Sequence, residues 1–117
     1  MASQFERPTP AGSAVSLRRI VAVSRRSVER KLRKTGERLR GLRDELVVID
    51  EQLAHLTDDA DEKSIRALVA ENPAAAIEHR EAVGHSEAMA EHRRRMVAEI
   101  AGLEARQDEL LDELRLL

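Results

Sequence analysis

The sequence contains no cysteine, tryptophan or tyrosine, and only one phenylalanine among its 117 residues. The absence of cysteine excludes disulfide frameworks, thiolate metal sites and a cysteine nucleophile. Aromatic side chains supply much of the buried area of compact cores, so we do not expect a thick core. No apolar run approaches the roughly 20 residues that span a bilayer, and residues 1–13 lack the apolar centre of a secretory signal. No membrane span is therefore predicted, and the cytoplasm is the expected location.

Two separate stretches of the sequence instead have a mostly apolar residue at every third or fourth position. This spacing places each set on one stripe of a helix, as in the seam of a coiled coil. The first stripe consists of Leu32, Thr35, Leu39, Leu42, Leu46, Ile49, Leu53 and Leu56. The second consists of Met89, Arg93, Met96, Ile100, Leu103, Gln107, Leu110, Leu114 and Leu117. Two stripes in one chain predict an all-α fold built on a long antiparallel coiled-coil hairpin, with a parallel self-dimer of the same helices as the alternative.

The pattern divides the chain into four segments. Residues 1–13 contain two of the three prolines and no periodicity, which is typical of a disordered tail. One long helix is predicted for residues 14–56, a short helical or turn tip for 57–85, and a second long helix for 86–117. The strongest break is Asn72-Pro73, because asparagine caps helices and proline suits the first helical position. If the chain turns there, the numbers of opposing residues add to about 145, and the two stripes face each other.

In this register residues 14–27 extend past the end of the second helix and have no partner in the same chain. Their apolar residues are Val15, Leu17, Ile20, Val21 and Val23. An apolar face left in water costs about 25 cal/mol for each Å² that could be buried. We therefore predict that these five residues bind a protein partner or a second copy of the chain, giving a homo-oligomer. The expected function is that of a non-enzymatic interaction or adaptor protein without a cofactor.

The net charge of −2 hides an uneven distribution of charged residues. Residues 14–43 carry eleven basic and two acidic residues, whereas residues 44–72 carry two basic and nine acidic residues. Within the hairpin most of the basic run is expected to pair with acidic residues, either on the same helix or on the second one. The arginines of segment 14–27 have no such partner and are candidates for anion binding; they are Arg18, Arg19, Arg25 and Arg26. Nucleic acid is the alternative partner that they suggest.

An acidic cluster formed by Asp58, Asp59, Asp61 and Glu62 follows the first stripe. The spacing Asp58-x-x-Asp61 resembles the coiled-coil tips of factors that enter the secondary channel of bacterial RNA polymerase, where tip carboxylates reach the catalytic magnesium. This resemblance implies an alternative function, that of a transcription regulator acting on the polymerase through an acidic tip or on DNA through the N-terminal arginines. The sequence lacks the cysteine zinc site of such factors, and acids that cap helices in a solvated connection explain the same residues. No catalytic residue and no metal site is predicted.

Overall fold

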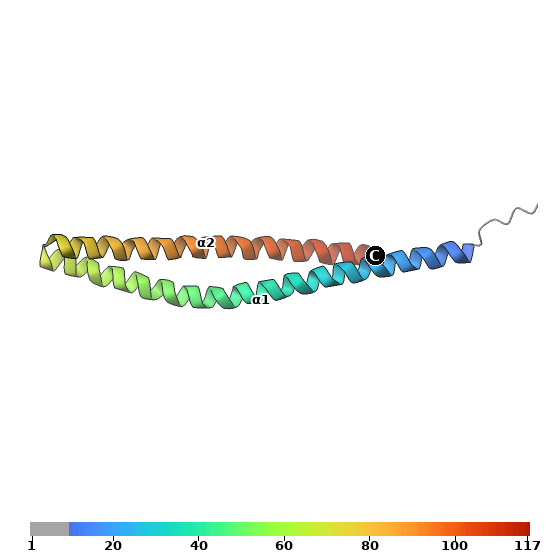
Figure 1. The fold of residues 1–117 in the computed structure, drawn as a ribbon, viewed down its shortest axis with the longest axis horizontal. Coiled ribbons are helices and arrows are strands. Elements are labelled where there is room, and N and C mark those ends of the chain that lie inside the picture. Colours follow the sequence, from blue (N-terminus) through green and yellow to red (C-terminus); the bar gives the residue numbers. More distant parts are fainter. Residues whose placement is uncertain (1–9) are drawn as a thin grey trace, which may run out of the picture. The chain divides into compact units, whose positions relative to one another are not determined.

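The computed structural model describes residues 10–117, with side chains from Ser16 onward. Two helices make up this part of the chain, α1 (Pro10–Ala70) and α2 (Pro73–Leu116) (Figure 1). The predicted tail therefore ends earlier than residue 13, because α1 already begins at Pro10, where the fixed φ and missing N–H of proline suit a first helical turn. The rest of the predicted tail, residues 1–9, lies outside the described residues. None of the described helices has a stretch that is long and apolar enough to cross a membrane.

The two helices form a hairpin that divides into two compact units. The turn unit consists of Glu37–Glu104 and contains the end of α1, the turn and most of α2. The terminal unit combines the described residues before Glu37 with Ala105–Leu117. In each unit a segment of α1 packs against a segment of α2, so the all-α antiparallel hairpin is confirmed.

The turn between the helices consists of Glu71 and Asn72. Glu71 has a φ of 49°, the left-handed conformation that commonly ends a helix, and its N–H donates to the carbonyl oxygen of Ala67 at 3.3 Å. Asn72 then caps α2, because its Oδ1 accepts a hydrogen bond from the N–H of Ala75 at 2.8 Å. Pro73 takes the first helical position. The chain therefore reverses at the Asn72-Pro73 break that the sequence predicts.

The predicted seam residues form the contact between the helices. In the turn unit the buried core consists of Leu39, Leu42, Ile49, Met96 and Ile100, with Leu46, Met89 and Leu103 packed against it. In the terminal unit Val28 and Leu110 are buried, and Leu110 is completely inaccessible to solvent. No polar or charged side chain is fully buried among the described residues, although the seam positions Thr35, Arg93 and Gln107 are half-buried.

Polar contacts beside the seam show the register of the hairpin. Arg93, which occupies a seam position of α2, donates from its Nε to Oδ1 of Asp50. The hydroxyl oxygens of Thr57 and Ser86 lie 3.4 Å apart across the two helices. The numbers of the two residues add to 143 in both pairs, which is within one helical turn of the predicted register.

Beyond Leu56 the seam continues with small residues, and here the structure differs from the prediction. The sequence predicts separate short helices over 57–85, but α1 runs unbroken to Ala70 and α2 passes through Gly84 and Ser86. The reason is that Ala60 and Ala82 occupy buried seam positions, with exposed fractions of 8% and 3%. Small residues at three-four spacing maintain helix pairing where large apolar residues are absent.

Candidate interaction surfaces

The seam residues of α1 become more exposed to solvent toward the N-terminus. Val28 is 2% exposed, whereas Val21, two turns earlier, is 41% exposed and Leu17 is 63% exposed. Ile20 and Val23 are 61% and 55% exposed. We call the segment 16–27 the overhang, and its apolar residues Leu17, Ile20, Val21 and Val23 the overhang stripe. The predicted fifth member, Val15, lies outside the residues whose side chains are described.

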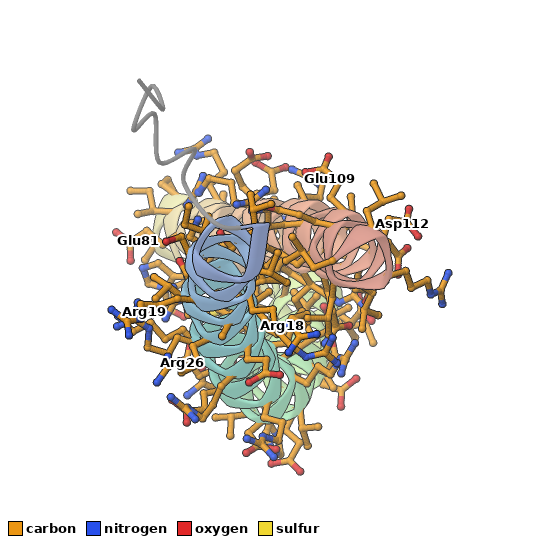
Figure 2. The ribbon with its side chains drawn as sticks, turned by 90° about the vertical axis from the view of Figure 1, so that its right-hand side faces the viewer. Arg18, Arg19, Arg26, Glu81, Glu109 and Asp112 are labelled. Carbon is orange, nitrogen blue, oxygen red and sulfur yellow. The ribbon has the colours of Figure 1, made fainter. Side chains whose placement is uncertain are left out.

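The overhang presents its four arginines around the same helix. Arg25 pairs with Glu29 one turn later, at 3.3 Å, and Nε of Arg26 donates to the carbonyl oxygen of Ala22. Figure 2 shows Arg19 and Arg26 on one side of α1 and Arg18 directed away from them. The overhang therefore combines an uncovered apolar stripe with positive charge on more than one side.

The basic run that follows is less neutralised than the sequence predicts. Among its cations, Arg38 reaches Glu99 at 2.9 Å and Arg43 reaches Glu104 at 3.2 Å across the hairpin. The other five cations of this run have no carboxylate oxygen within 4.0 Å among the described residues; these are Arg30, Lys31, Arg33, Lys34 and Arg40. In the overhang the same is true of Arg18, Arg19 and Arg26. Two acidic residues of α2 pair within their own helix instead, since Asp112 pairs with Arg115 and Glu109 pairs with Arg106.

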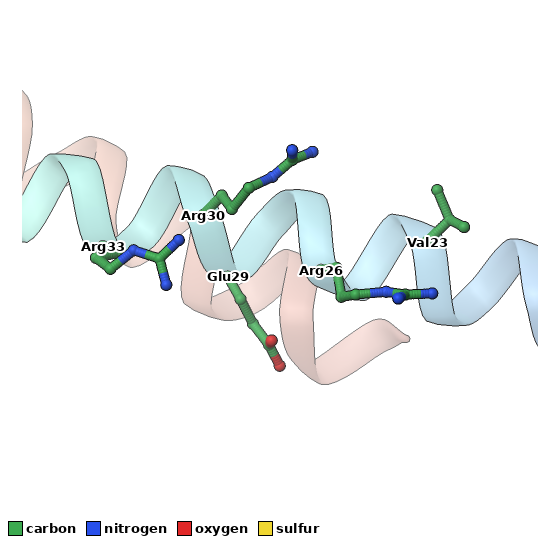
Figure 3. A pocket seen from close by; sticks show the side chains of 5 residues that line it. All are labelled: Val23, Arg26, Glu29, Arg30 and Arg33. Carbon is green, nitrogen blue, oxygen red and sulfur yellow. The ribbon is translucent and has the colours of Figure 1, made fainter.

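Part of this basic run lines a shallow hollow of about 530 Å³ on α1. Val23, Arg26, Arg30 and Arg33 come from successive turns of the helix, with Glu29 beside them (Figure 3). Three arginines and one glutamate line this hollow, and the glutamate pairs with Arg25 outside it, so the hollow carries an excess of positive charge. This charge favours an anionic group over a cationic one.

The acidic cluster lies within α1 and not at the turn. Its residues stand 8 to 12 positions before the end of the helix at Ala70, so they do not form the end of the hairpin. Asp59 pairs with Lys63 at 3.1 Å and Glu62 with Arg66 at 2.7 Å, each across one helical turn. Asp58 and Asp61 are exposed and make no ion pair among the described residues. The expected tip location therefore differs from the observed one, because the helix continues through these acids.

A second uncovered apolar surface lies on α1 next to the turn. Ile65, Leu68 and Val69 are 64%, 75% and 80% exposed, and we call these three residues the turn face. Their spacing marks an apolar helix face in the sequence, but it does not show that the face points away from α2. The rotation of α1 is set by the leucines before it, which place Ala60 and Ala67 toward α2 and the turn face opposite.

Two other features concern ionisation. The hydrogen bond from Arg38 to Glu99, with the attraction between their charges, raises the pKa of the arginine, and the hydrogen bonds from Arg94 lower the pKa of Glu91. Both pairs are exposed, which is usual for ion pairs that flank a coiled-coil seam.

Among the residues that the structure describes, no three histidine or carboxylate side chains gather where they could hold a metal ion.

Comparisons with protein-family models, with curated proteins and with solved structures find no match to this chain.

Proposed function

We propose that this protein is a non-enzymatic interaction module that binds another protein chain, either a second copy or a larger assembly, through the overhang. The observation that supports this function is the fall in burial along one continuous helix stripe. Val28 is almost fully covered, and the same face is 41–63% exposed at Val21, Ile20 and Leu17. An apolar helix face that is exposed to solvent usually indicates a protein–protein contact.

The size of this surface indicates a contact of moderate strength. Complete burial of a valine, leucine or isoleucine side chain contributes about 1.5–3 kcal/mol, and the four side chains of the overhang stripe are each roughly half exposed. Covering them would therefore contribute about 3–6 kcal/mol. Association has its own entropic cost of several kcal/mol, so further contacts are required for stable binding. The flanking arginines are suited to provide them by pairing with acidic groups.

The test is to replace two stripe residues by aspartate in the full chain, I20D/V21D. We expect association to be lost, because two carboxylates would have to be buried in an apolar contact. The matched control is V47D/V48D, an adjacent pair on α1 with similar exposure, 59% and 50%. Association is measured by sedimentation velocity of the purified chain and by crosslinking in cells, and circular dichroism checks that both variants stay helical. Equal association of I20D/V21D and V47D/V48D would rule out the overhang as the binding surface.

A second candidate function is binding to the phosphate backbone of nucleic acid. It is favoured by the eight basic residues that have no carboxylate partner within the described part of the chain. Phosphate binding by such residues releases counterions, so affinity should fall steeply with salt. We expect R19A/R26A to weaken binding of duplex DNA and to reduce the slope of affinity against salt. The control is R106A/R115A, which removes two arginines already paired within α2. Affinity that does not change with salt would exclude this function.

A further inference from the structure

Two apolar surfaces are left uncovered among the described residues, and they carry opposite charge. The overhang contains four arginines and no acidic residue. The turn face lies on the same side of α1 as Asp58 and Asp61, which precede Ile65 by seven and four residues and make no ion pair among the described residues. The stretch 58–71 contains five acidic and two basic residues. The overhang is therefore a basic apolar surface, and the turn face is an acidic apolar one.

Charge makes it unfavourable for either surface to pair with its own copy. Two overhangs in contact would bring eight arginines together, with only the Glu29 carboxylate that pairs with Arg25 in each copy to offset them. Two turn faces would bring together aspartates that make no ion pair among the described residues. Like charges placed opposite each other destabilise a contact and select against that pairing. An overhang placed on a turn face instead aligns arginines with aspartates along the edges of an apolar contact.

The apolar parts of the two surfaces are similar in extent. The exposed residues of the overhang stripe run from Leu17 to Val23, and those of the turn face run from Ile65 to Val69. At 1.5 Å per residue these segments rise by about 9 Å and about 6 Å along the helix. One turn face can therefore cover most of an overhang stripe in a helix-to-helix contact. The three members of the turn face are 64–80% exposed, so they offer the overhang stripe an apolar surface of similar size.

We infer that copies of this chain associate head to tail, with the overhang of one copy bound to the turn face of the next. This inference rests on the proposed function and names the partner of the overhang. Where a single contact of this kind joins two copies, one overhang and one turn face stay free for further copies, whereas two reciprocal contacts would close a dimer. The expected product is an open series of oligomers that grows with concentration, not a single closed dimer.

The experiment uses two full-length variants that each lose one surface. I20D/V21D removes the overhang stripe, and L68D/V69D removes the turn face; all four positions are exposed, so both variants should keep the hairpin, which circular dichroism verifies. Sedimentation velocity is run on the wild type, on each variant alone and on their equimolar mixture. V47D/V48D serves as the control with an intact overhang and turn face.

We expect the wild type to form oligomers larger than dimers as its concentration rises, and to do so severalfold less strongly in high salt. Each variant alone should be monomeric. Their mixture should form a dimer of twice the 13.1 kDa chain and nothing larger, because only one intact overhang and one intact turn face remain. V47D/V48D should associate like the wild type.

Three results would overturn the inference. If the wild type is monomeric at every concentration, a second copy is not the partner. The proposed function then stands if crosslinking in cells joins the overhang to another protein. Association lost in I20D/V21D but unchanged in L68D/V69D shows that the overhang binds something other than the turn face. Association unchanged in I20D/V21D overturns the inference and the proposed function together.

Discussion

Replacement of Ala82 by leucine should destabilise the hairpin, because the helices have no space for a larger side chain at this position. Ala82 is 3% exposed and Ala60 is 8% exposed, although each side chain is a single methyl group. A methyl group is covered to this degree only where the facing helix comes close. The 3.4 Å distance between the hydroxyl oxygens of Thr57 and Ser86 indicates the same close approach. Leucine would add three carbon atoms to a contact that is already filled.

The expected cost follows from measured overpacking of well-packed cores, which is typically about 1–3 kcal/mol. For a domain of this size each kcal/mol lowers the melting temperature by several degrees, so A82L should melt on the order of 5–15 °C lower than the wild type. Thermal unfolding followed by circular dichroism measures this shift. The matched control is A88L, the same change at an exposed position of α2, which should leave the melting temperature nearly unchanged. Equal melting of A82L and A88L would show that the helices near the turn are not closely packed.

Three further predictions concern single positions. L42A should lower the free energy of unfolding by about 2–5 kcal/mol, because Leu42 is 2% exposed. L68A is the control and should change this free energy by less than about 0.5 kcal/mol. Both are measured by unfolding in urea, at a dilution where the chain is monomeric. R94A should raise the pKa of Glu91 back toward its usual value, as measured by NMR titration. In the wild type the ionised Glu91 stabilises the fold at any pH above the pKa that it has in the unfolded chain. This stabilisation is lost as the pH falls through the lowered pKa of the folded state. E71G should stabilise the chain by up to about 1 kcal/mol in urea unfolding, since glycine adopts a positive φ without strain; a destabilised E71G would contradict this account of the turn.

The sequence was sufficient to predict the hairpin because two independent patterns agree. The three-four spacing of leucines predicts which residues face the partner helix, and Asn72-Pro73 predicts where the chain turns. The burial of Leu39 and Leu42, and the capping of α2 by Asn72, confirm both patterns. Each pattern depends on local chemistry, seam periodicity in one case and helix capping in the other, and such chemistry can be recognised without coordinates.

The segment next to the turn could not be predicted in the same way. Ile65 and Leu68 are more apolar than Ala60 and Ala67, so their hydrophobicity alone predicts that they face the core. In the structure the preceding leucines fix the rotation of α1, and helical periodicity then directs the alanines toward α2. The sequence therefore shows an apolar face but not the direction in which it points.

The ion pairs were also only partly predictable. Acidic residues of α2 lie within reach of basic residues both on their own helix and on α1, and the two kinds of pair differ little in energy at exposed positions. Glu104 pairs across the hairpin, whereas Asp112 pairs within α2. Which of the two forms depends on side-chain geometry at each position, and charge patterning does not contain that information.

The two-residue turn also has a consequence for how the turn unit folds. Thr57 and Ser86 are separated by 29 residues in the chain, whereas Arg38 and Glu99 are separated by 61. Closing a loop costs more entropy as the loop lengthens, so contacts beside the turn form first. Seam contacts farther from the turn then form next to contacts that already exist. We therefore expect changes at Ala82 to alter the rate of folding and changes at Leu39 to alter mainly the rate of unfolding. A connection this short makes the formation of the hairpin an ordered process that starts at one end.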